Sequence, residues 1–435
     1  MRWRASDVAT AVGGELRGAD VQVDGASIDS RSIRPGQLFV PIVGDRDGHD
    51  FVDAARAAGA AAHLTARGGG EPEPVIVVAD PALALLDLGR LARTGLPDRV
   101  VGVTGSVGKT TTKELLRTVL ERRYRTAASE RSFNNELGVP LTLANAPTAT
   151  EAAVIEMGAR DRGHIALLCD VARPTIGVVT VVAGAHLEVF GSIDDVARAK
   201  GELIEALPSD GTAVLNADDE RVAAMAARST APVRTFGLTS GDVRAEAITL
   251  DDEVRPSFRL VSDTGAVEVR LGLHGHHQVT NALAAATAAL AAGCTLDDVV
   301  AGLAAAQSPG LRMDLRRAAS GALVLDDSYN ANPTSMTSAL DALVALPARR
   351  RVAVLGVMAE LGTGSASAHR EIGARAEELG LEVISVAAPD YGVTDAADID
   401  EVIDRLGALG EGDVVLVKGS RVAGLEALAA ALVAG

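Results

Sequence analysis

The sequence is poor in cysteine, in aromatic residues and in positive charge. Its two cysteines, Cys169 and Cys294, lie far apart in sequence, which excludes a disulfide framework and a cysteine zinc site. Aromatic residues make up 2% of a chain that is 48% hydrophobic, so alanine, valine and leucine must supply most of the buried surface. With 41 Lys and Arg against 58 Asp and Glu, the net charge is −17, and we expect neither a nucleic-acid nor a membrane partner.

The pattern of a signal peptide or of a membrane-spanning helix is also missing. The first residues, MRWRASDVATAVGG, lack the apolar core of a signal peptide. The uncharged stretch 271–296 is long enough to cross a bilayer, but it contains three histidines and is mostly alanine. We interpret it as a loop followed by a buried helix. These features together predict a reduced, cytoplasmic protein, which we expect to be a monomer.

Breaks in composition divide the chain into three segments. At roughly 150 residues per domain, 435 residues predict about three domains. Clusters of proline and glycine at 93–97 and 307–310 interrupt the periodic stretches. They place the domains at residues 1–96, 97–308 and 309–435.

Short apolar runs alternate with helical stretches in the second and third segments. Such alternation predicts an α/β fold with parallel sheets covered on both faces, and ligands in such folds bind beyond the carboxyl ends of the strands. The first segment is a smaller, mixed α/β pattern. Strands are predicted at 100–104, 153–156, 176–182, 323–327, 351–356 and 414–418, and helices at 81–93, 111–120 and 281–306.

A phosphate-binding loop is the clearest motif. Residues 105–112, GSVGKTTT, follow a predicted strand and open a predicted helix. Glycines let the backbone wrap closely around phosphate, and the helix N-terminus offers N–H groups and positive partial charge. Lys109 is then expected to reach the terminal phosphates and Thr110 to meet Mg²⁺, although Val103 stands where the usual motif has glycine. The expected nucleotide contacts are Gly105, Ser106, Val107, Gly108, Lys109, Thr110 and Thr111.

Three further residues are candidates for a role beside this loop. Glu156 ends a predicted strand, and a carboxylate beside a phosphate loop commonly holds Mg²⁺. By themselves, His186 fits an ordinary loop histidine and Lys200 a solvent-exposed lysine on a helix. Because kinases, GTPases, motor ATPases and ligases all carry such a loop, these residues alone indicate only a Mg-nucleotide enzyme.

A longer series of motifs resembles the Mur ligase family. The series follows the family order along nearly the whole chain, which makes it far more specific than any single motif. It comprises residues 29–31 (DSR), 36–41 (GQLFVP), 47–51 (DGHDF), 105–112, 132–143 (SFNNELGVPLTL), 156–160 (EMGAR), 185–191 (AHLEVFG), 199–202 (AKGE), 326–335 (DDSYNANPTS), 356–362 (GVMAELG) and 418–421 (KGSR).

The resemblance implies three domains and a ligation reaction. It implies a UDP-substrate-binding domain, a central P-loop ATPase-like domain with a parallel sheet, and a Rossmann-like domain that binds the incoming dipeptide. The motifs are most similar to those of the member that joins D-alanyl-D-alanine to UDP-N-acetylmuramoyl-tripeptide through an acyl phosphate in peptidoglycan synthesis. They are compatible with diaminopimelate or lysine as the third residue of the tripeptide.

The resemblance also implies roles for individual residues. Lys109, His186 and Lys200 would be catalytic, and two Mg²⁺ ions would be held by Thr110, Glu156, His186 and a carbamylated Lys200. ATP would further contact Asn281, Arg312 and Asp326 or its neighbour Asp327, while Gln278 and Val181 replace asparagines of the family. The UDP-linked substrate would bind Ser30, Arg31, Asn134 and Asn135, and the dipeptide Asn330, Asn332, Lys418, Ser420 and Arg421.

Three alternatives remain at this point. The ligase that adds the third residue shares the central domain, but the segments YNANP and EMG favour the dipeptide-adding member. Folylpolyglutamate synthase shares the phosphate loop but lacks a first domain like residues 1–96. A regulatory nucleotide-binding protein without catalysis would keep Lys109 and lose Glu156, His186 or Lys200, all of which are present.

Overall fold

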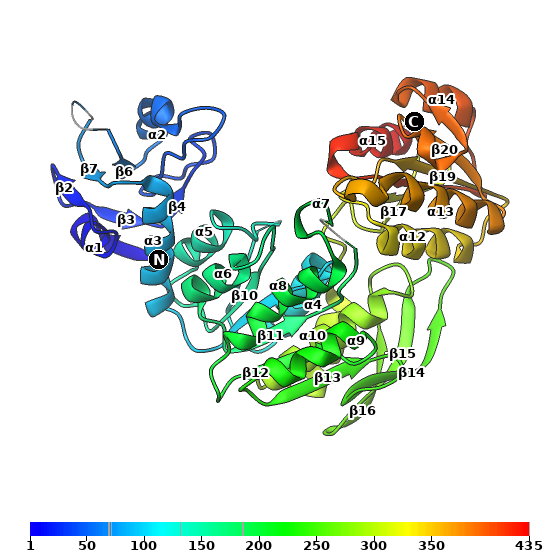
Figure 1. Cartoon of the computed structure of the whole chain (residues 1–435), viewed down its shortest axis with the longest axis horizontal. Helices are drawn as coiled ribbons and strands as arrows, with labels where there is room; N and C mark the ends of the chain where they lie inside the picture. The colour runs from blue at the N-terminus through cyan, green and yellow to red at the C-terminus, as the bar shows by residue number, and fades with distance from the viewer. Residues whose placement is uncertain (68–69, 71, 131, 185–186, 435) are drawn as a thin grey trace.

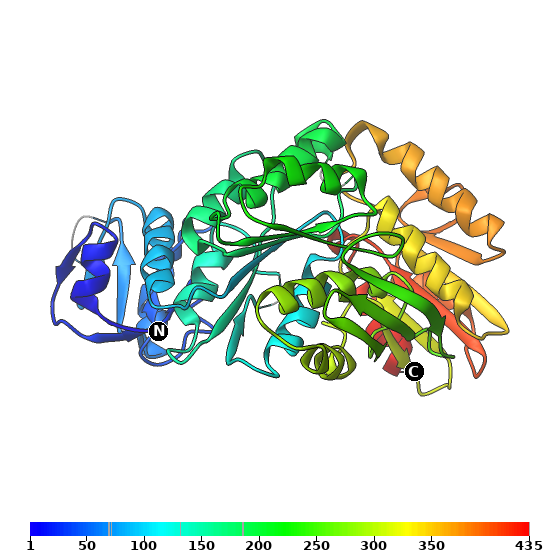
Figure 2. The same cartoon turned by 90° about the horizontal axis from the view of Figure 1, so that it is seen from below.

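Three units follow one another along the molecule. The computed structural model describes residues 1–67, 70, 72–130, 132–184 and 187–434. Figures 1 and 2 show the N-terminal unit at one end of a row, the central unit in the middle and the C-terminal unit at the other end. Each unit has a sheet of its own, so the predicted three-domain α/β architecture is confirmed.

The N-terminal unit is built on a five-stranded mixed sheet with the order β2-β7-β6-β5-β4. The short strand β4 forms one edge of this sheet and lies against helix α5 (Gly138–Asn145) of the central unit. The elements are β1 (Arg2–Arg4), α1 (Ala5–Ala11), β2 (Glu15–Arg17), β3 (Gln22–Asp24), β4 (Ala26–Ser27), β5 (Leu38–Phe39), the 3-10 helix η1 (Gly48–Phe51), α2 (Val52–Ala57), β6 (Ala62–Thr65) and β7 (Val75–Val77).

The central unit holds a nine-stranded sheet with the order β16-β15-β14-β13-β12-β11-β8-β10-β9. Neighbouring strands from β9 to β14 are parallel, whereas β14, β15 and β16 form an antiparallel extension that the sequence patterns did not predict. Only two residues join β15 to β16, too few for the crossover that a parallel pair requires. The strands are β8 (Val100–Thr104), β9 (Thr126–Ala128), β10 (Ala152–Glu156), β11 (Ile176–Val179), β12 (Thr212–Asn216), β13 (Val233–Gly237), β14 (Val243–Leu250), β15 (Pro256–Ser262) and β16 (Gly265–Arg270).

Helices cover both faces of the central sheet. One apolar cluster joins the sheet to α4, α10 and α11, and another joins its other face to α3, α5, α6 and α8. The helices are α3 (Pro81–Thr94), α4 (Lys109–Leu120), α5, α6 (His164–Ala172), α7 (Leu187–Phe190), α8 (Ile193–Glu205), α9 (Glu220–Ala223), the 3-10 helix η2 (Ala224–Arg228), α10 (Gln278–Ala291) and α11 (Leu296–Ala305). In the described ranges, no helix combines the length and apolar character needed to span a membrane.

Two of the predicted elements differ from the structure. The single helix predicted at 281–306 is two helices, because Gly293 takes a left-handed φ of +92° and Thr295 caps a new helix by accepting a hydrogen bond from the Asp298 N–H. The strand predicted at 176–182 ends at Val179, and the chain then turns toward the phosphate loop.

The C-terminal unit has a six-stranded sheet with the order β17-β18-β22-β19-β20-β21, parallel except for β17. The five parallel strands follow the predicted Rossmann-like pattern, and β17 adds one antiparallel edge strand. Its elements are β17 (Asp314–Arg317), β18 (Leu323–Asp327), α12 (Pro333–Ala345), β19 (Arg350–Gly356), η3 (Gly362–Gly364), α13 (Ser365–Glu378), β20 (Glu382–Val386), η4 (Pro389–Tyr391), β21 (Thr394–Ala396), α14 (Ile399–Leu406), β22 (Asp413–Lys418), η5 (Arg421–Ala423) and α15 (Glu426–Ala434).

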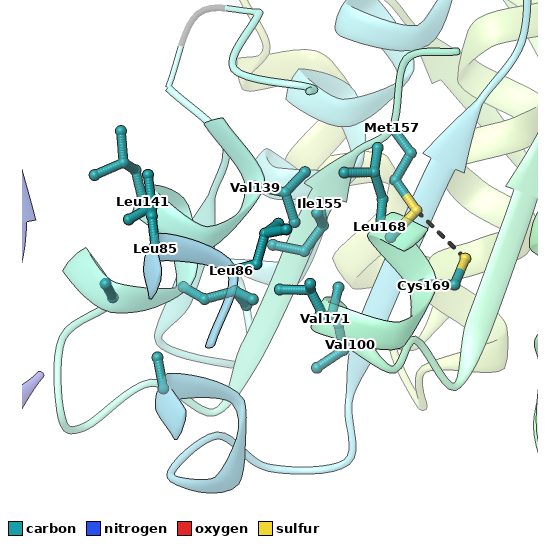
Figure 3. Close-up of a cluster of buried hydrophobic side chains, with 14 of the residues drawn as sticks. Leu85, Leu86, Val100, Val139, Leu141, Ile155, Met157, Leu168, Cys169 and Val171 are labelled. Carbon is teal, nitrogen blue, oxygen red and sulfur yellow. Dashed lines mark hydrogen bonds between the residues drawn. The ribbon is translucent and has the colours of Figure 1, made fainter. Parts of the chain in front are cut away.

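Helix α3 connects the first two units through a shared core. The boundary predicted after residue 96 assigns α3 to the first domain, yet its main packing partners are α5 and α6 of the central unit. Figure 3 shows Leu85 and Leu86 of α3 in one cluster with Val139, Leu141 and Val171, and the same cluster places the Cys169 thiol 3.8 Å from the Met157 sulfur. The apolar core is therefore continuous from the first unit into the second.

The close packing of α3 generates a stability prediction. A Cβ at Gly89 would lie 2.6 Å from Pro140 Cβ and 2.8 Å from Val171 Cγ1. The ring and backbone of Pro140 cannot rotate away from this contact. We expect Gly89→Ala to destabilise the protein by about 1–3 kcal/mol through overpacking, despite the roughly 1 kcal/mol that alanine adds to an isolated helix. Urea unfolding measures the change, with Thr94→Ala on the exposed end of α3 as the control. A more stable Gly89→Ala variant would contradict this packing.

Candidate active site

A cavity of about 520 Å³ lies where the three units meet at the carboxyl ends of the central strands. The central unit contributes most of its wall, the C-terminal unit faces it, and Ile28 reaches it from the N-terminal unit. Of the residues predicted from the sequence, it brings together Ser106, Val107, Gly108, Lys109, Thr110, Thr111, Asn134, Asn135, Glu156, Lys200, Asn281, Arg312, Asp327, Asn330, Asn332 and Lys418.

Two glycines allow the phosphate loop to pass close to its neighbours. Gly105 has a φ of +149° and Gly108 a φ of +87°, in a region that favours glycine. A Cβ at Gly105 would overlap the Thr180 hydroxyl, and a Cβ at Gly108 would overlap the Asn281 side-chain oxygen. The loop is therefore restricted to glycine at both positions by its packing as well as by its conformation.

Backbone contacts hold this loop against the end of β11. The Ser106 N–H donates to the Val181 carbonyl at 2.7 Å, and the Thr180 hydroxyl donates to the Val107 carbonyl at 2.6 Å. The contact to residue 181 uses only its main chain, which any residue type offers. Val103 is still part of strand β8 and is fully buried, so the glycine-dependent turn begins two residues later.

Lys109 begins helix α4 and folds back over its own loop. Its Nζ donates to the Gly105 carbonyl at 2.7 Å. Burial lowers the pKa of Lys109, the carboxylate of Glu156 opposes this shift, and the guanidinium of Arg312 adds to it. An incoming phosphate would offer this ammonium group a stronger acceptor than the carbonyl that it now contacts.

The carboxylate of Glu156 suits a divalent cation. It is 1% exposed at the end of β10, and its Oε1 accepts a 2.8 Å hydrogen bond from the Asn134 amide. Its Oε2 is buried and has no hydrogen-bond partner among the described residues. With the Thr110 hydroxyl lining the same cavity, this orphaned oxygen gives Mg²⁺ the hard oxygen ligands that it prefers. Asn134, which the sequence suggested as a substrate contact, here orients Glu156.

Lys200 points from helix α8 into the same cavity. It is 2% exposed, and burial, with a smaller contribution from the positive charge of Lys109, sets the pKa of Lys200 well below its ordinary value. It is therefore not the solvated surface lysine that its helical position alone suggested. His186, the other residue predicted for the second metal, lies outside the described residues.

The segment 275–281 closes one side of the cavity. The Asn281 amide donates to Gln278 Oε1 at 2.8 Å, and both side chains are at least nine-tenths buried. Gln278, which departs from the family pattern, thus supports Asn281 directly. His277 also lines the cavity, and burial lowers its pKa to about 4, so the ring is neutral near neutral pH.

Arg312 is held in a strained linker between the central and C-terminal units. Leu311 and Met313, on either side of it, both have a φ of +53°, which is unfavourable for residues with a Cβ. The guanidinium lies 3.9 Å from the centre of the Tyr329 ring, and its Nη2 is 3.5 Å from Ser132 Oγ. These contacts keep Arg312 directed toward the phosphate loop.

Lys418 is occupied by partners within the C-terminal unit. Its Nζ contacts Asp327 Oδ2 at 2.5 Å and donates to the Asn330 carbonyl at 3.0 Å. Asn332 caps helix α12 by accepting from the Ser335 N–H at 2.9 Å. Lys418 therefore ties the ends of β18 and β22 to the loop 328–332, rather than presenting a free ammonium group.

Six predicted residues within the described ranges do not line the cavity. One is Gly105, whose carbonyl accepts from Lys109 at the start of the phosphate loop. Ser30 and Arg31 lie on the N-terminal unit, where Arg31 is 87% exposed and pairs with Asp29. Asp326 is buried and accepts a hydrogen bond from the Ser328 hydroxyl, and burial raises the pKa of Asp326. The neighbouring Asp327 faces the cavity instead. Ser420 is buried and accepts from the Ala359 N–H, and Arg421 is exposed and pairs with Glu426.

Several lining residues escaped the sequence analysis. They include Phe133, Arg160, His277, Tyr329 and Glu360. All but His277 are next to or within motifs that were recognised for other residues, and His277 precedes Gln278 directly. Which residue of a motif turns toward the cavity depends on the local backbone, which no motif specifies.

Comparison with known families gives three matches in order along the chain. The description "Mur ligase family, catalytic domain" matches residues 22–87, "Mur ligase middle domain" matches residues 103–289, and "Mur ligase, glutamate ligase domain" matches residues 311–421. Each match falls inside one of the three predicted segments.

Curated relatives match over nearly the whole chain. The UDP-N-acetylmuramoyl-tripeptide--D-alanyl-D-alanine ligase of Escherichia coli (strain K12) is 39% identical, covering 98% of this chain and 97% of its own. The protein of the same name from Mycobacterium tuberculosis (strain H37Rv) is 40% identical and covers 99% and 97%.

Solved structures agree in fold. MurF from Acinetobacter baumannii has a TM-score of 0.91 at 32% identity and covers 100% of this chain and 99% of its own. MurF ligase from Thermotoga maritima in complex with ADP has a TM-score of 0.83 at 30% identity and covers 93% and 96%. A folylpolyglutamate synthase (FPGS) mutant from L. casei, at 17% identity and a TM-score of 0.62, shares the fold alone.

The glycine-dependent loop yields a binding prediction. We expect Gly105→Ala to weaken ATP binding at least tenfold, because the new Cβ would displace the Thr180 hydroxyl that holds the Val107 carbonyl. Isothermal titration calorimetry with ATP and Mg²⁺ measures the effect. Gly380→Ala is the matched control, since Gly380 has a φ of +68° with open space around it, far from the cavity in sequence. Equal ATP affinity in the two variants would remove this loop from nucleotide binding.

Proposed function

The chain belongs to the Mur ligase family, and we propose that it joins D-alanyl-D-alanine to UDP-N-acetylmuramoyl-tripeptide with consumption of ATP. The product is the UDP-muramoyl-pentapeptide of peptidoglycan synthesis, so the enzyme serves cell-wall formation and through it cell shape and division. We place the reaction in the cytoplasm, where ATP is available.

One observation carries this function: the cavity combines a phosphate loop, a buried carboxylate that suits Mg²⁺ and the C-terminal loop 327–332 in one space. A nucleotide-binding regulator has no need for the second and third of these. The ligase that adds diaminopimelate is 20% identical, with a TM-score of 0.55, so it shares the fold, whereas the tripeptide-specific relatives share 39–40% of the sequence.

The first step activates the substrate. An oxygen of the tripeptide's terminal carboxylate attacks the γ-phosphorus of ATP, the bond to ADP breaks, and an acyl phosphate forms. Lys109 at the phosphate loop and Arg312 above it offset the negative charge that gathers on the transferred group. Both side chains are held by the protein before ATP arrives, so little reorganisation is needed.

The residues around Glu156 fit the Mg²⁺ that this chemistry requires. Thr110 and Glu156 would hold one ion, while His186 and a carbamate on Lys200 would hold a second. When bound, Mg²⁺ neutralises phosphate charge and polarises the phosphoryl group. Phosphate oxygens of ATP, which are hard ligands, would complete the coordination of these ions.

The use of lysine supports a special role for Lys200. The chain has 37 arginines and only four lysines, at positions 109, 113, 200 and 418, and three of these lysines line the cavity. A neutral lysine amine can add CO₂ and release a proton to give a carbamate, and the lowered pKa of Lys200 favours that neutral amine.

The second step forms the amide bond. The amine of D-alanyl-D-alanine attacks the acyl carbon, the bond to the phosphate oxygen breaks, and inorganic phosphate leaves. The dipeptide would lie against Asn330 and Asn332 of the C-terminal unit, in front of Lys418. Ser420 and Arg421 lie just after the end of β22 and would border this site. Ser30 and Arg31 would hold the UDP portion.

Substrate dependence tests this function. Phosphate release from ATP should require both UDP-N-acetylmuramoyl-tripeptide and D-alanyl-D-alanine, with the pentapeptide identified by mass spectrometry. Release with the dipeptide replaced by diaminopimelate, and the tripeptide by the UDP-linked dipeptide, would instead identify the ligase that adds the third residue.

Lys200 gives the sharpest mutational prediction. We expect Lys200→Ala to be nearly inactive and to regain partial activity with added short carboxylates, which supply the missing oxygen ligands. Lys200→Arg should be equally inactive, because a guanidinium group does not take up CO₂. Ligation rates measure both effects, with Arg198→Ala on the exposed side of α8 as the control. Wild-type activity in Lys200→Arg would show an ordinary cation at this position.

Arg31 gives a second prediction, on the N-terminal unit. We expect Arg31→Ala to raise the KM for the UDP-linked tripeptide about ten- to a hundredfold, since a charge-assisted contact to phosphate contributes roughly 1.5–3 kcal/mol. The KM for ATP should stay the same. Steady-state kinetics separates the two, and Arg2→Ala, another exposed arginine paired with an aspartate, is the control. An equal rise for ATP would mean that the substrate domains are assigned wrongly.

A further inference from the structure

One asparagine makes several hydrogen bonds between the N-terminal unit and the central unit. Asn145 is the last residue of α5, and all its side-chain hydrogen bonds but one cross to the N-terminal unit. Its Oδ1 accepts from the Ala26 N–H at 3.1 Å and from the Gln37 amide at 2.8 Å, with Arg34 Nη2 at 3.3 Å. Its Nδ2 donates to the Ala26 carbonyl at 2.8 Å and to Leu141 of its own helix at 3.0 Å.

The contact extends the sheet of the N-terminal unit. Ala26 begins β4, the edge strand, and both of its backbone groups pair with the Asn145 amide as they would with a neighbouring strand. Gly25 takes a φ of +77°, and a Cβ there would overlap Asn145 Oδ1. The approach of the two units at this point is therefore close and depends on an amide that both donates and accepts.

Helix α5 transmits this contact to the cavity. Its first residues, with Leu137 before them, line the cavity, while Asn145 stands at its other end. On the opposite side of the contact, Ile28 lies two residues after Ala26 and also lines the cavity. The turn that carries Arg31 follows at once, fixed by Asp29, which accepts from both the backbone and the guanidinium of Arg31.

We propose that Asn145 is a positioning residue for the UDP-linked substrate: it sets the distance and register between the turn 27–31 and the cavity. The proposal rests on the proposed function, because it assumes that this turn holds the uridine diphosphate while the peptide end lies at the phosphate loop. A substrate that spans two units binds well only when their spacing matches its length, whereas ATP lies within the central unit and its C-terminal neighbour.

Asn145→Asp tests the proposal most directly. The two side chains have nearly the same shape, but aspartate cannot donate and would place a negative charge against the carbonyl oxygens of Ala26 and Leu141. We expect the affinity for UDP-N-acetylmuramoyl-tripeptide, measured by calorimetry without ATP, to fall at least tenfold. The KM for the same substrate should rise in parallel, with the KM for ATP and for D-alanyl-D-alanine changed less than twofold.

Two further variants make the result decisive. Gly25→Ala pushes on Asn145 from the other unit and should reproduce the same selective loss. Thr142→Ala removes a hydroxyl that bonds only within α5, to the Gly138 carbonyl at 2.9 Å, and should leave substrate affinity unchanged. Melting temperatures report whether each variant folds.

The outcomes separate this proposal from the proposed function. Wild-type ligation tests the function by itself, and its absence would remove the premise. If the wild-type protein ligates and folded Asn145→Asp binds the UDP-linked tripeptide with wild-type affinity, Asn145 does not position the substrate. Equal losses for all three substrates would likewise show a general structural role.

Discussion

The central physical feature of the structure is a cluster of positive side chains at the cavity, which a bound anion would stabilise. Lys109, Lys200 and Arg312 line one cavity, where the carboxylate of Glu156 partly offsets the effect of burial on Lys109. Burial lowers the pKa of both lysines, and a neighbouring positive charge adds to the shift: that of Arg312 for Lys109 and that of Lys109 for Lys200. In the proposed reaction, the phosphates of ATP and of the acyl phosphate would supply negative charge to these cations. A cluster of positive side chains fixed in this way suits the proposed phosphoryl transfer.

Short connections join the three units around the cavity. A continuous apolar core and the Asn145 contact join the first unit to the central one, while the strained linker around Arg312 joins the third. The first connection is broad and apolar, which suits a fixed spacing for a long substrate. The second is a narrow segment with left-handed residues on both sides of Arg312, which suits the proposed completion of the site by the C-terminal unit.

Much of this arrangement could be predicted from the sequence. The strands at 100–104 and 323–327 have the predicted limits, and the phosphate loop is where its motif places it, because β-branched runs and glycine act through local backbone preferences. Side-chain direction could not be predicted. Asp327 rather than Asp326 faces the cavity, since neighbouring strand residues point to opposite sides, and Asn134 turns to Glu156 through a contact that only the assembled sheet creates. The Ala-rich helix breaks at Gly293. This break was not predicted, because helices sometimes tolerate a glycine.

The acyl-phosphate route is the central claim, and an oxygen label tests it most directly. UDP-N-acetylmuramoyl-tripeptide carrying ¹⁸O in its terminal carboxylate is incubated with the enzyme, ATP and D-alanyl-D-alanine, and the released phosphate is analysed by mass spectrometry. Attack of the carboxylate on the γ-phosphorus predicts one labelled oxygen in each phosphate formed from doubly labelled substrate. Phosphate without label, released while the pentapeptide forms, would contradict this mechanism.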